Sequence, residues 1–246
     1  GKDEQLTQWQ GQLNYTLSPD GSALLLNAST RIQPAELFVQ PIGGELKQLT
    51  NYTSEAFKNY AWQAPEVVAV PSSHGAGEVY ARVYVPQGYS KDNADKYPAV
   101  IFNHGAGYLQ NAHYGFSGYF REFMFHNLLA QQGYVVFQLD NRGSYNRGKA
   151  FEDPIYRNMG SVEVDDQVAG VKWLRQQAFV DPQRIGIYGH SYGGYMSLMG
   201  LFKASEYFQA GVSGAPVTDW ALYDTHYTER YMANPESNKN GYQASA

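Results

Sequence analysis

Cysteine is absent from this chain of 246 residues, and its absence removes several kinds of chemistry. Without a thiol the chain can form no disulfide bond, no thiolate metal site and no cysteine nucleophile, although the compartment stays open and we favour a periplasmic or secreted location. Basic residues are also scarce: 18 lysines and arginines face 23 aspartates and glutamates, so nothing suggests nucleic acid or an anionic membrane as a partner. No run of about 18 apolar residues occurs, and we therefore expect no membrane-spanning helix in this chain.

Residues 13–62 consist of short apolar runs separated by turn signals, which is typical of antiparallel β-structure. The runs are Tyr15–Leu17, Ala23–Leu26 and Glu36–Val39, and the turn signals are Ser18–Gly21 and Gly43–Gly44. Such evenly spaced strands would form one blade of a β-propeller. One blade cannot bury its faces alone, so we predict that residues 1–64 are the last antiparallel segment of a propeller, with a linker, whose earlier blades lie upstream.

From about residue 65 the pattern changes to alternating strands and helices. Val67–Val70 and Val79–Val85 are expected to pair around the turn His74–Gly77. Ala99–Phe102 and Tyr134–Phe137 are continuous apolar runs, which indicate central strands covered on both faces.

Helices are expected between these strands. Phe120–Gln132 suits a helix that ends at Gly133. Apolar residues that recur at steps of three and four predict a second helix, namely Val164, Val168, Val171 and Leu174. Ser161 is expected to be its N-cap, with Glu163 in its first turn. With Phe208–Val212 as a further strand, this order predicts an α/β class and an α/β-hydrolase fold for residues 65–246.

The pentapeptide Gly189–Gly193 has the pattern G-x-S-x-G, with Ser191 at its centre. It follows a short predicted strand, Arg184–Tyr188, and precedes a predicted helix, Gly194–Leu201. This context is typical of a nucleophile elbow, in which the serine takes a strained backbone conformation and only glycine fits two residues to either side. The pattern alone is weak evidence, but in this context it favours Ser191 as a catalytic nucleophile over a structural turn.

A second short motif, Asn103–Gly107, follows the first predicted central strand and has the letters N-H-G-A-G. In an α/β-hydrolase the loop at this position lends a backbone N–H group to the oxyanion hole, and the residue after the nucleophile, here Tyr192, lends another. The small residues Gly105 and Ala106, next to His104, would let the backbone approach a substrate oxygen. An ordinary glycine-rich turn between strand and helix is the alternative.

The other members of a catalytic triad are harder to find, since the fold places an aspartate or glutamate and then a histidine after the serine. His226 is the only histidine after Ser191, and the acids between them are Glu206, Asp219 and Asp224. Only 33 residues follow Ser213, whereas one complete βαβ unit takes about 30 or more. We therefore expect a fragment, truncated at its C-terminus, that lacks its base and acid and is inactive by itself. We disfavour His226 as the base because it would lie on a lid-like segment.

Several segments resemble the prolyl oligopeptidase family of serine peptidases. Gly189–Tyr195 resembles that family's G-x-S-Y-G-G-Y elbow, and Asp140–Ser144 resembles its D-x-R-G-S loop. The dipeptidyl-peptidase IV branch in particular is resembled by Ala215–Trp220, Tyr223–Asp224 and Tyr227–Met232. The resemblance covers roughly residues 60–235 and implies an α/β-hydrolase domain preceded by a β-propeller.

The resemblance also implies roles for single residues. Ser191 would form an acyl-enzyme with a peptide substrate, releasing short amino-terminal peptides after proline or alanine. The flat apolar pocket for that proline would be lined by Tyr192, Val217, Trp220, Tyr223 and Tyr227. A rigid pyrrolidine ring presents an apolar disc, which aromatic walls bury at little entropic cost. A homodimer of the full-length protein is a further expectation. Because neither a phosphate loop nor metal-ligand spacing occurs, we expect no cofactor and no metal.

One position departs from the dipeptidyl-peptidase IV pattern. His104 stands where that branch has a tyrosine whose hydroxyl serves the oxyanion, and His104–Ala106 resembles instead the H-G-G-P loop of acylaminoacyl-peptidases. Tyr108 could still supply a hydroxyl. The glutamate pair that binds a substrate's amino group in that branch belongs to the propeller and would lie upstream of residue 1. An acylaminoacyl-peptidase, an esterase-like hydrolase and a non-catalytic interaction module therefore stay open as alternatives.

Overall fold

The computed structural model describes residues 3–73, 75, 77–90, 92, 95–119 and 122–246. The chain divides into two compact units. The first unit comprises Gly1–Pro65 with His113–Leu128, and the second comprises Glu66–Ala112 with Leu129–Ala246. Of the predicted turn His74–Gly77, His74 and Ala76 lie outside the described residues, as does Phe120 at the start of a predicted helix.

The first unit contains a four-stranded antiparallel sheet whose strands follow one another in sequence order. The strands are β1 (Gln12–Leu17), β2 (Ala23–Ser29), β3 (Glu36–Pro41) and β4 (Lys47–Gln48), and a short helix α1 (Glu55–Lys58) follows. The three predicted strands and their antiparallel pairing are thus confirmed.

Only part of this sheet's apolar face is covered. Leu26, on the central strand β2, is fully buried and pairs with Tyr15 of β1 on one side and Phe38 of β3 on the other. Residues paired across an antiparallel sheet share a face. Tyr15 is nevertheless 69% exposed, and Leu17 on the same edge strand is 51% exposed. The β1 side of the apolar face therefore lies open in the described part of the chain.

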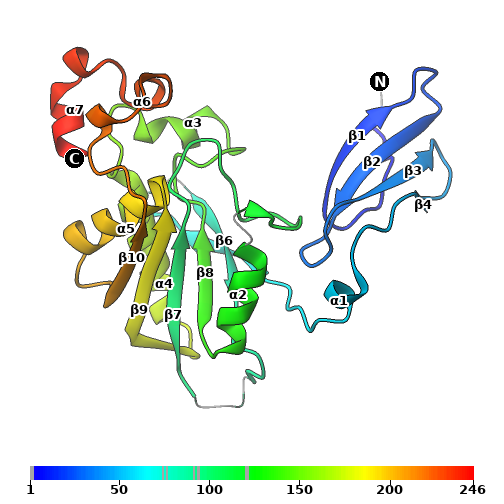
Figure 1. The fold of residues 1–246 in the computed structure, drawn as a ribbon, viewed down its shortest axis with the longest axis horizontal. Helices are drawn as coiled ribbons and strands as arrows, with labels where there is room; N and C mark the ends of the chain where they lie inside the picture. Colours follow the sequence, from blue (N-terminus) through cyan, green and yellow to red (C-terminus); the bar gives the residue numbers. More distant parts are fainter. Residues whose placement is uncertain (1–2, 74, 76, 91, 93–94, 120–121) are drawn as a thin grey trace. The chain divides into compact units, whose positions relative to one another are not determined.

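The second unit is built on a six-stranded mixed sheet in the order β10-β9-β7-β8-β6-β5 (Figure 1). Its strands are β5 (Glu66–Pro71), β6 (Glu78–Tyr84), β7 (Tyr97–Asn103), β8 (Val135–Leu139), β9 (Val180–His190) and β10 (Ala210–Gly214). β5, β6 and β8 pair antiparallel, whereas β8, β7, β9 and β10 run parallel. All five residues of β8 are buried, as expected of a central strand. The fold class is therefore α/β.

Two long helices cover one face of this sheet. α5 (Tyr192–Lys203) contacts β7, β9 and β10, and α4 (Val162–Arg175) contacts β5, β9 and α5. The predicted apolar residues of α4 point inward, since Val164, Val171 and Leu174 are buried.

α2 (Glu122–Gln131) lies within its predicted range and is followed by Gly133, whose φ of +86° ends it.

Of two predicted details of these elements, one is wrong and one is confirmed. β10 begins at Ala210, two residues later than predicted, and Phe208 is instead a buried residue ahead of the strand. Ser161 occupies the N-cap position of α4 as predicted, although its hydroxyl makes no cap hydrogen bond and donates to the Asn158 carbonyl. The carboxylate of Glu163 accepts the N–H groups of Gly160 and Ser161, just ahead of the helix.

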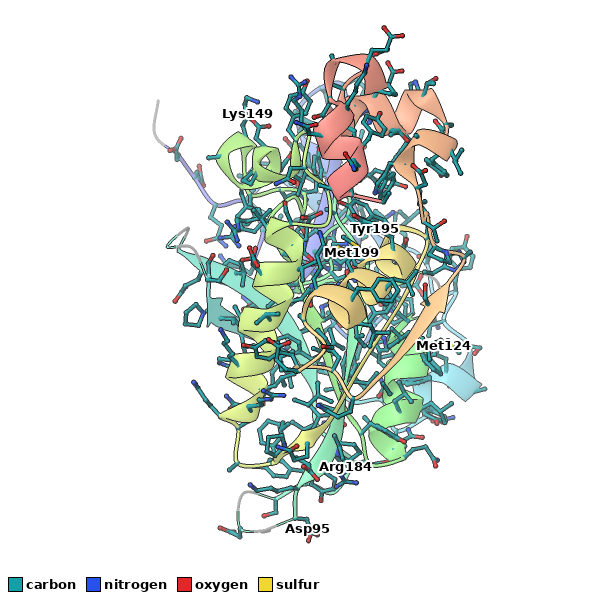
Figure 2. The ribbon with its side chains drawn as sticks, turned by 90° about the vertical axis from the view of Figure 1, so that its left-hand side faces the viewer. Asp95, Met124, Lys149, Arg184, Tyr195 and Met199 are labelled. Atoms are coloured by element: carbon teal, nitrogen blue, oxygen red, sulfur yellow. The ribbon has the colours of Figure 1, made fainter. Side chains whose placement is uncertain are left out.

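The shorter helices gather at one end of the second unit. They are α3 (Lys149–Glu152), the 3₁₀ helices η2 (Asp153–Ile155), η3 (Trp220–Leu222) and η4 (Pro235–Ser237), α6 (Thr225–Met232) and α7 (Lys239–Ala244). Figure 1 shows α3, α6 and α7 together beyond the end of the sheet at which β9 leads into α5. In Figure 2, Lys149 of α3 lies toward one end of the unit and Arg184 of β9 toward the opposite end. The candidate site residues lie at the end marked by α3.

Candidate active site

Ser191 lies in a tight turn between a strand and a helix. β9 ends at His190 and α5 begins at Tyr192, so Ser191 is the single residue between them. Its φ of 59° and ψ of −117° fall in a region that L-residues rarely occupy. This is the strained conformation that the pattern around Ser191 predicts.

Glycine is required on both sides of Ser191. A Cβ atom at Gly189 would overlap the carbonyl oxygens of Asn103 and Gly193, and a Cβ atom at Gly193 would overlap the same Asn103 oxygen. The prediction that only glycine fits at these two positions is therefore confirmed. The crowding also brings the loop after β7 directly against the turn.

That loop, Asn103–Gly107, presents few free N–H groups. The N–H of Gly105 donates to the side-chain oxygen of Asn103 at 2.7 Å, and the N–H of Gly107 donates to the Gly143 carbonyl at 2.7 Å. Ala106, which is buried, makes no N–H hydrogen bond to any described residue. Gly105 has a φ of +92°, and a Cβ atom there would lie 2.5 Å from Cγ of Tyr192. The loop backbone therefore packs directly on the Tyr192 side chain.

The imidazole of His104 is buried and held by an acid. Its Nε2 atom lies 3.0 Å from Oδ1 of Asp140, whose carboxylate also accepts the N–H groups of Asn111 and Ala112. His104 was expected beside the oxyanion only by its place in the loop. In the structure its side chain anchors the loop to the segment after β8.

The D-x-R-G-S segment supports the same loop. Asn141 donates from its side chain to the Gly105 carbonyl at 2.9 Å. Arg142 forms a buried ion pair with Asp166 of α4, with Nε–Oδ2 and Nη2–Oδ1 distances of 2.9 Å each. The motif was recognised in the sequence, but these contacts depend on residues more than 20 positions away in the chain.

The side chain of Tyr192 is buried and bonded to a carboxylate. Its hydroxyl donates to Oε1 of Glu163 at 2.6 Å, and Glu163 also accepts the N–H groups of Gly160 at 2.7 Å and Ser161 at 2.9 Å. Burial raises the pKa of Glu163, and burial together with the Glu163 charge raises the pKa of Tyr192 well above its ordinary value. The sequence pattern predicts Glu163 only in the first turn of a helix and gives no sign of this contact.

Four of the five predicted pocket residues form one aromatic cluster, which consists of Tyr192, Trp220, Tyr223 and Tyr227. The Trp220 ring lies 5.0 Å from Tyr192, 6.2 Å from Tyr223 and 6.1 Å from Tyr227, with which it is stacked. Trp220 is buried, whereas Tyr223 is 42% exposed, so the cluster has an inner and an open side. Val217, the fifth, is half-buried and packs on the main core.

Two acids between Ser191 and His226 act as helix caps. The Asp219 carboxylate accepts the Ala221 N–H at 2.9 Å at the start of η3, and the Asp224 carboxylate accepts the Tyr227 N–H at 2.8 Å at the start of α6. These bonds cap the two short helices that carry Trp220 and Tyr227.

No histidine in the described residues bonds to the Ser191 hydroxyl, for which no hydrogen bond occurs there at all. His226 lies exposed on α6. Within the same residues, no group of three or more histidines and acids could hold a metal ion. The described helices include none long and apolar enough to cross a membrane.

Comparison with known proteins gives consistent matches. Residues 121–246 match the profile of the prolyl oligopeptidase family. Dipeptidyl peptidase 8 of Mus musculus is 45% identical over 181 residues, which are 72% of this chain and 20% of that protein. Dipeptidyl peptidase 8 of Homo sapiens is 44% identical over 181 residues, which are 72% of this chain and 19% of that protein. The structure of Porphyromonas gingivalis dipeptidyl peptidase 4 superposes with a TM-score of 0.86 at 31% identity, covering 98% of this chain and 34% of that one. The chain thus spans about a fifth of the length of these curated relatives.

Proposed function

Because the chain belongs to the prolyl oligopeptidase family, we propose that it carries the nucleophile of a serine peptidase that releases short amino-terminal peptides, preferably after proline or alanine. One observation carries the proposal: a strained serine at a strand-to-helix turn lies next to an aromatic cluster, and Tyr192 belongs to both.

The proposed reaction is acyl transfer through Ser191. Its Oγ attacks the scissile carbonyl carbon, a general base takes the hydroxyl proton and returns it to the leaving amine, and water then hydrolyses the acyl-enzyme. We propose that the base and its acid come from a part of the protein outside residues 1–246. Two observations support this: no histidine bonds to Ser191 in the described residues, and the matched part of the chain covers only about a fifth of the relatives' length.

The proposed oxyanion donors are main-chain N–H groups. The N–H of Tyr192 belongs to the first turn of α5, where it has no acceptor within the helix. The Ala106 N–H is the better second donor, because the Gly105 N–H is already bonded to Asn103. His104 would contribute by anchoring this loop through Asp140.

The aromatic cluster, with Val217 beside it, is the proposed pocket for the penultimate residue of the substrate. A proline ring is flat and rigid, so it loses little entropy when aromatic rings enclose it. The half-exposed ring of Tyr223 would lie at the mouth of the pocket and the buried ring of Trp220 at its base.

The finer architecture is also proposed. Residues 65–246 would be an incomplete α/β-hydrolase domain, to which further strands add beyond β10. Residues 1–64 would be the last blade of a β-propeller with its linker. The open side of the apolar face, at Tyr15 and Leu17, supports this because another blade would cover it. Homodimerisation of the full-length protein stays a prediction.

A fluorophosphonate probe tests the nucleophile in the full-length protein. Labelling is expected in the wild type and absent in Ser191→Ala, because the probe reacts with an activated serine hydroxyl. A matched Ser197→Ala variant should still label: Ser197 lies on α5 too, but its hydroxyl is buried and donates to the Gly193 carbonyl. Labelling that survives Ser191→Ala would disprove the assignment.

An acylaminoacyl-peptidase is the second candidate, because His104–Ala106 resembles the loop of that branch. Cleavage of an N-acetylated alanine substrate, with none of a Gly-Pro substrate that has a free amino group, would favour it.

A further inference from the structure

Glu163 is a buried carboxylate that the proposed reaction does not use. It is 0% exposed, and its contacts are the Tyr192 hydroxyl and the N–H groups of Gly160 and Ser161. All three groups donate to it. Burying a carboxylate is costly unless its oxygens are satisfied, so these donors are what keeps it in place.

Glu163 differs from the other fully buried acid of α4 in having no cationic partner among the described residues. Asp166, one turn later on α4, is equally buried but is neutralised by Arg142. Glu163 has no cation as partner among the described residues, and Tyr192 is its only side-chain donor. The Glu163 carboxylate therefore binds the Tyr192 hydroxyl and not a cationic side chain.

Tyr192 links the turn at Ser191, the loop after β7 and the aromatic cluster. It directly follows Ser191, its Cβ and Cγ atoms press against Gly105, and its ring meets Trp220 edge-on at 5.0 Å. These contacts hold the near end of the side chain and one side of the ring. The bond to Glu163 fixes the far end, since a hydroxyl bonded to a carboxylate is short and strong.

We propose that Glu163 is a positioning residue that acts through the Tyr192 hydroxyl and sets the preference of the pocket for proline over alanine. This inference rests on the proposed function. A proline ring fills the space against a fixed aromatic wall, so its transition state depends on where the wall stands. The alanine methyl group makes fewer contacts and depends on it less.

A double-mutant cycle in the full-length protein tests the proposal. Glu163→Gln and Tyr192→Phe are made singly and together, and kcat/KM is measured on Gly-Pro and Gly-Ala chromogenic substrates. Each single variant should lower kcat/KM on Gly-Pro by roughly tenfold or more, and on Gly-Ala by less, so the proline-to-alanine ratio falls. The double variant should be no worse than the poorer single variant, because both changes remove the same bond.

Tyr242→Phe is the matched control. Tyr242 lies on α7, is also buried, and donates its hydroxyl to the Ala233 carbonyl at 2.8 Å. Its loss should combine additively with Glu163→Gln. Additive losses for Glu163 and Tyr192, or an unchanged proline-to-alanine ratio, would overturn the proposal.

A folding check and a labelling check distinguish failure of the inference from misfolding and from failure of the proposed function. Should Glu163→Gln not fold, as judged by circular dichroism and thermal melting, Tyr192→Phe alone decides, because an unchanged ratio in that variant also overturns the proposal. Fluorophosphonate labelling of each variant reports Ser191 separately. Wild-type protein without Ser191-dependent labelling would refute the proposed function and this inference together, whereas normal labelling with an unchanged ratio refutes only the inference.

Discussion

Tyr227 lies at the centre of the aromatic cluster. Its ring is stacked on Trp220, meets Tyr223 edge-on at 5.6 Å and lies 5.0 Å from Tyr231. Tyr227→Ala should lower kcat/KM on Gly-Pro substrates by roughly tenfold or more, because it opens the pocket to water, and Tyr223→Ala should act in the same direction.

The matched control is Tyr52→Ala, which removes a tyrosine ring that is 83% exposed in the first unit. Activity there should stay at the wild-type value. If kcat/KM is unchanged in both cluster variants, the rings do not line the substrate pocket.

Tyr108 tests the source of the oxyanion bond. Its hydroxyl is the side-chain alternative to the main-chain donors, and it makes no hydrogen bond to a described residue. We expect Tyr108→Phe to change kcat by a few-fold at most. Loss of an oxyanion donor typically costs about 100- to 1,000-fold, so a decrease of that size would identify Tyr108 as the donor and reject the main-chain assignment.

At this scale the sequence predicts residues whose chemistry is local. Ser191 is found because its glycines are adjacent, and the tyrosines are found because their motif is contiguous. Glu163 is missed because its partner Tyr192 lies 29 positions away and meets it only in the folded chain. The hydrogen bond from the Gly105 N–H to the Asn103 side chain is missed for a different reason. The sequence N-H-G is compatible with more than one orientation of the Asn103 amide.

At the scale of elements, Glu36 ties strand β3 to the segment that follows β4. Its buried carboxylate accepts bonds from the Thr50 hydroxyl and from the N–H groups of Tyr52 and Thr53. The Thr50 hydroxyl bond, with the two N–H bonds, lowers the pKa of Glu36 below its ordinary value of 4.5. A lowered folded-state pKa stabilises the fold above pH 4.5, and this contribution is lost as pH falls through the folded-state pKa.

Hydrogen exchange measures the effect at the residues concerned. Protection factors at Tyr52 and Thr53 should stay constant down to about pH 4.5 in the wild type and fall below that pH. In Glu36→Gln they should be lower at neutral pH and nearly constant. Glu45→Gln, an exposed acid of the same unit, should behave like the wild type. Protection that is insensitive to pH in the wild type would contradict this.

Element positions follow from hydrophobic pattern more reliably than element ends do. The apolar runs Ala99–Phe102 and Tyr134–Phe137 were predicted as strands, and they lie in β7 and β8 except for Tyr134, which directly precedes β8. The start of β10 was misplaced because Phe208 is buried outside the strand, and burial alone does not distinguish strand from loop. The N-cap of α4 was predicted correctly at Ser161, but the bonds from the Gly160 and Ser161 N–H groups to the Glu163 carboxylate were not predicted.

For the whole molecule, the location of the general base makes a quantitative prediction. Residues 1–246 alone should react with a fluorophosphonate at least roughly a thousandfold more slowly than the full-length protein, because a serine without its base is a poor nucleophile. Ser191→Ala in the same chain gives the background. Equal rates would place the base within these residues, and His226→Ala would then be the first variant to examine.

The outer strand of the larger sheet has a consequence for handling this chain by itself. β10 pairs only with β9 among the described strands, its five residues carry no charge, and Val212 on it is 69% exposed. Unpaired strand edges recruit strands from other molecules, and natural proteins discourage this by placing lysine on them. Isolated chains should therefore associate edge to edge as concentration rises. Val212→Lys should shift sedimentation toward the monomer, whereas Leu222→Lys, an exposed leucine outside the strand, should not.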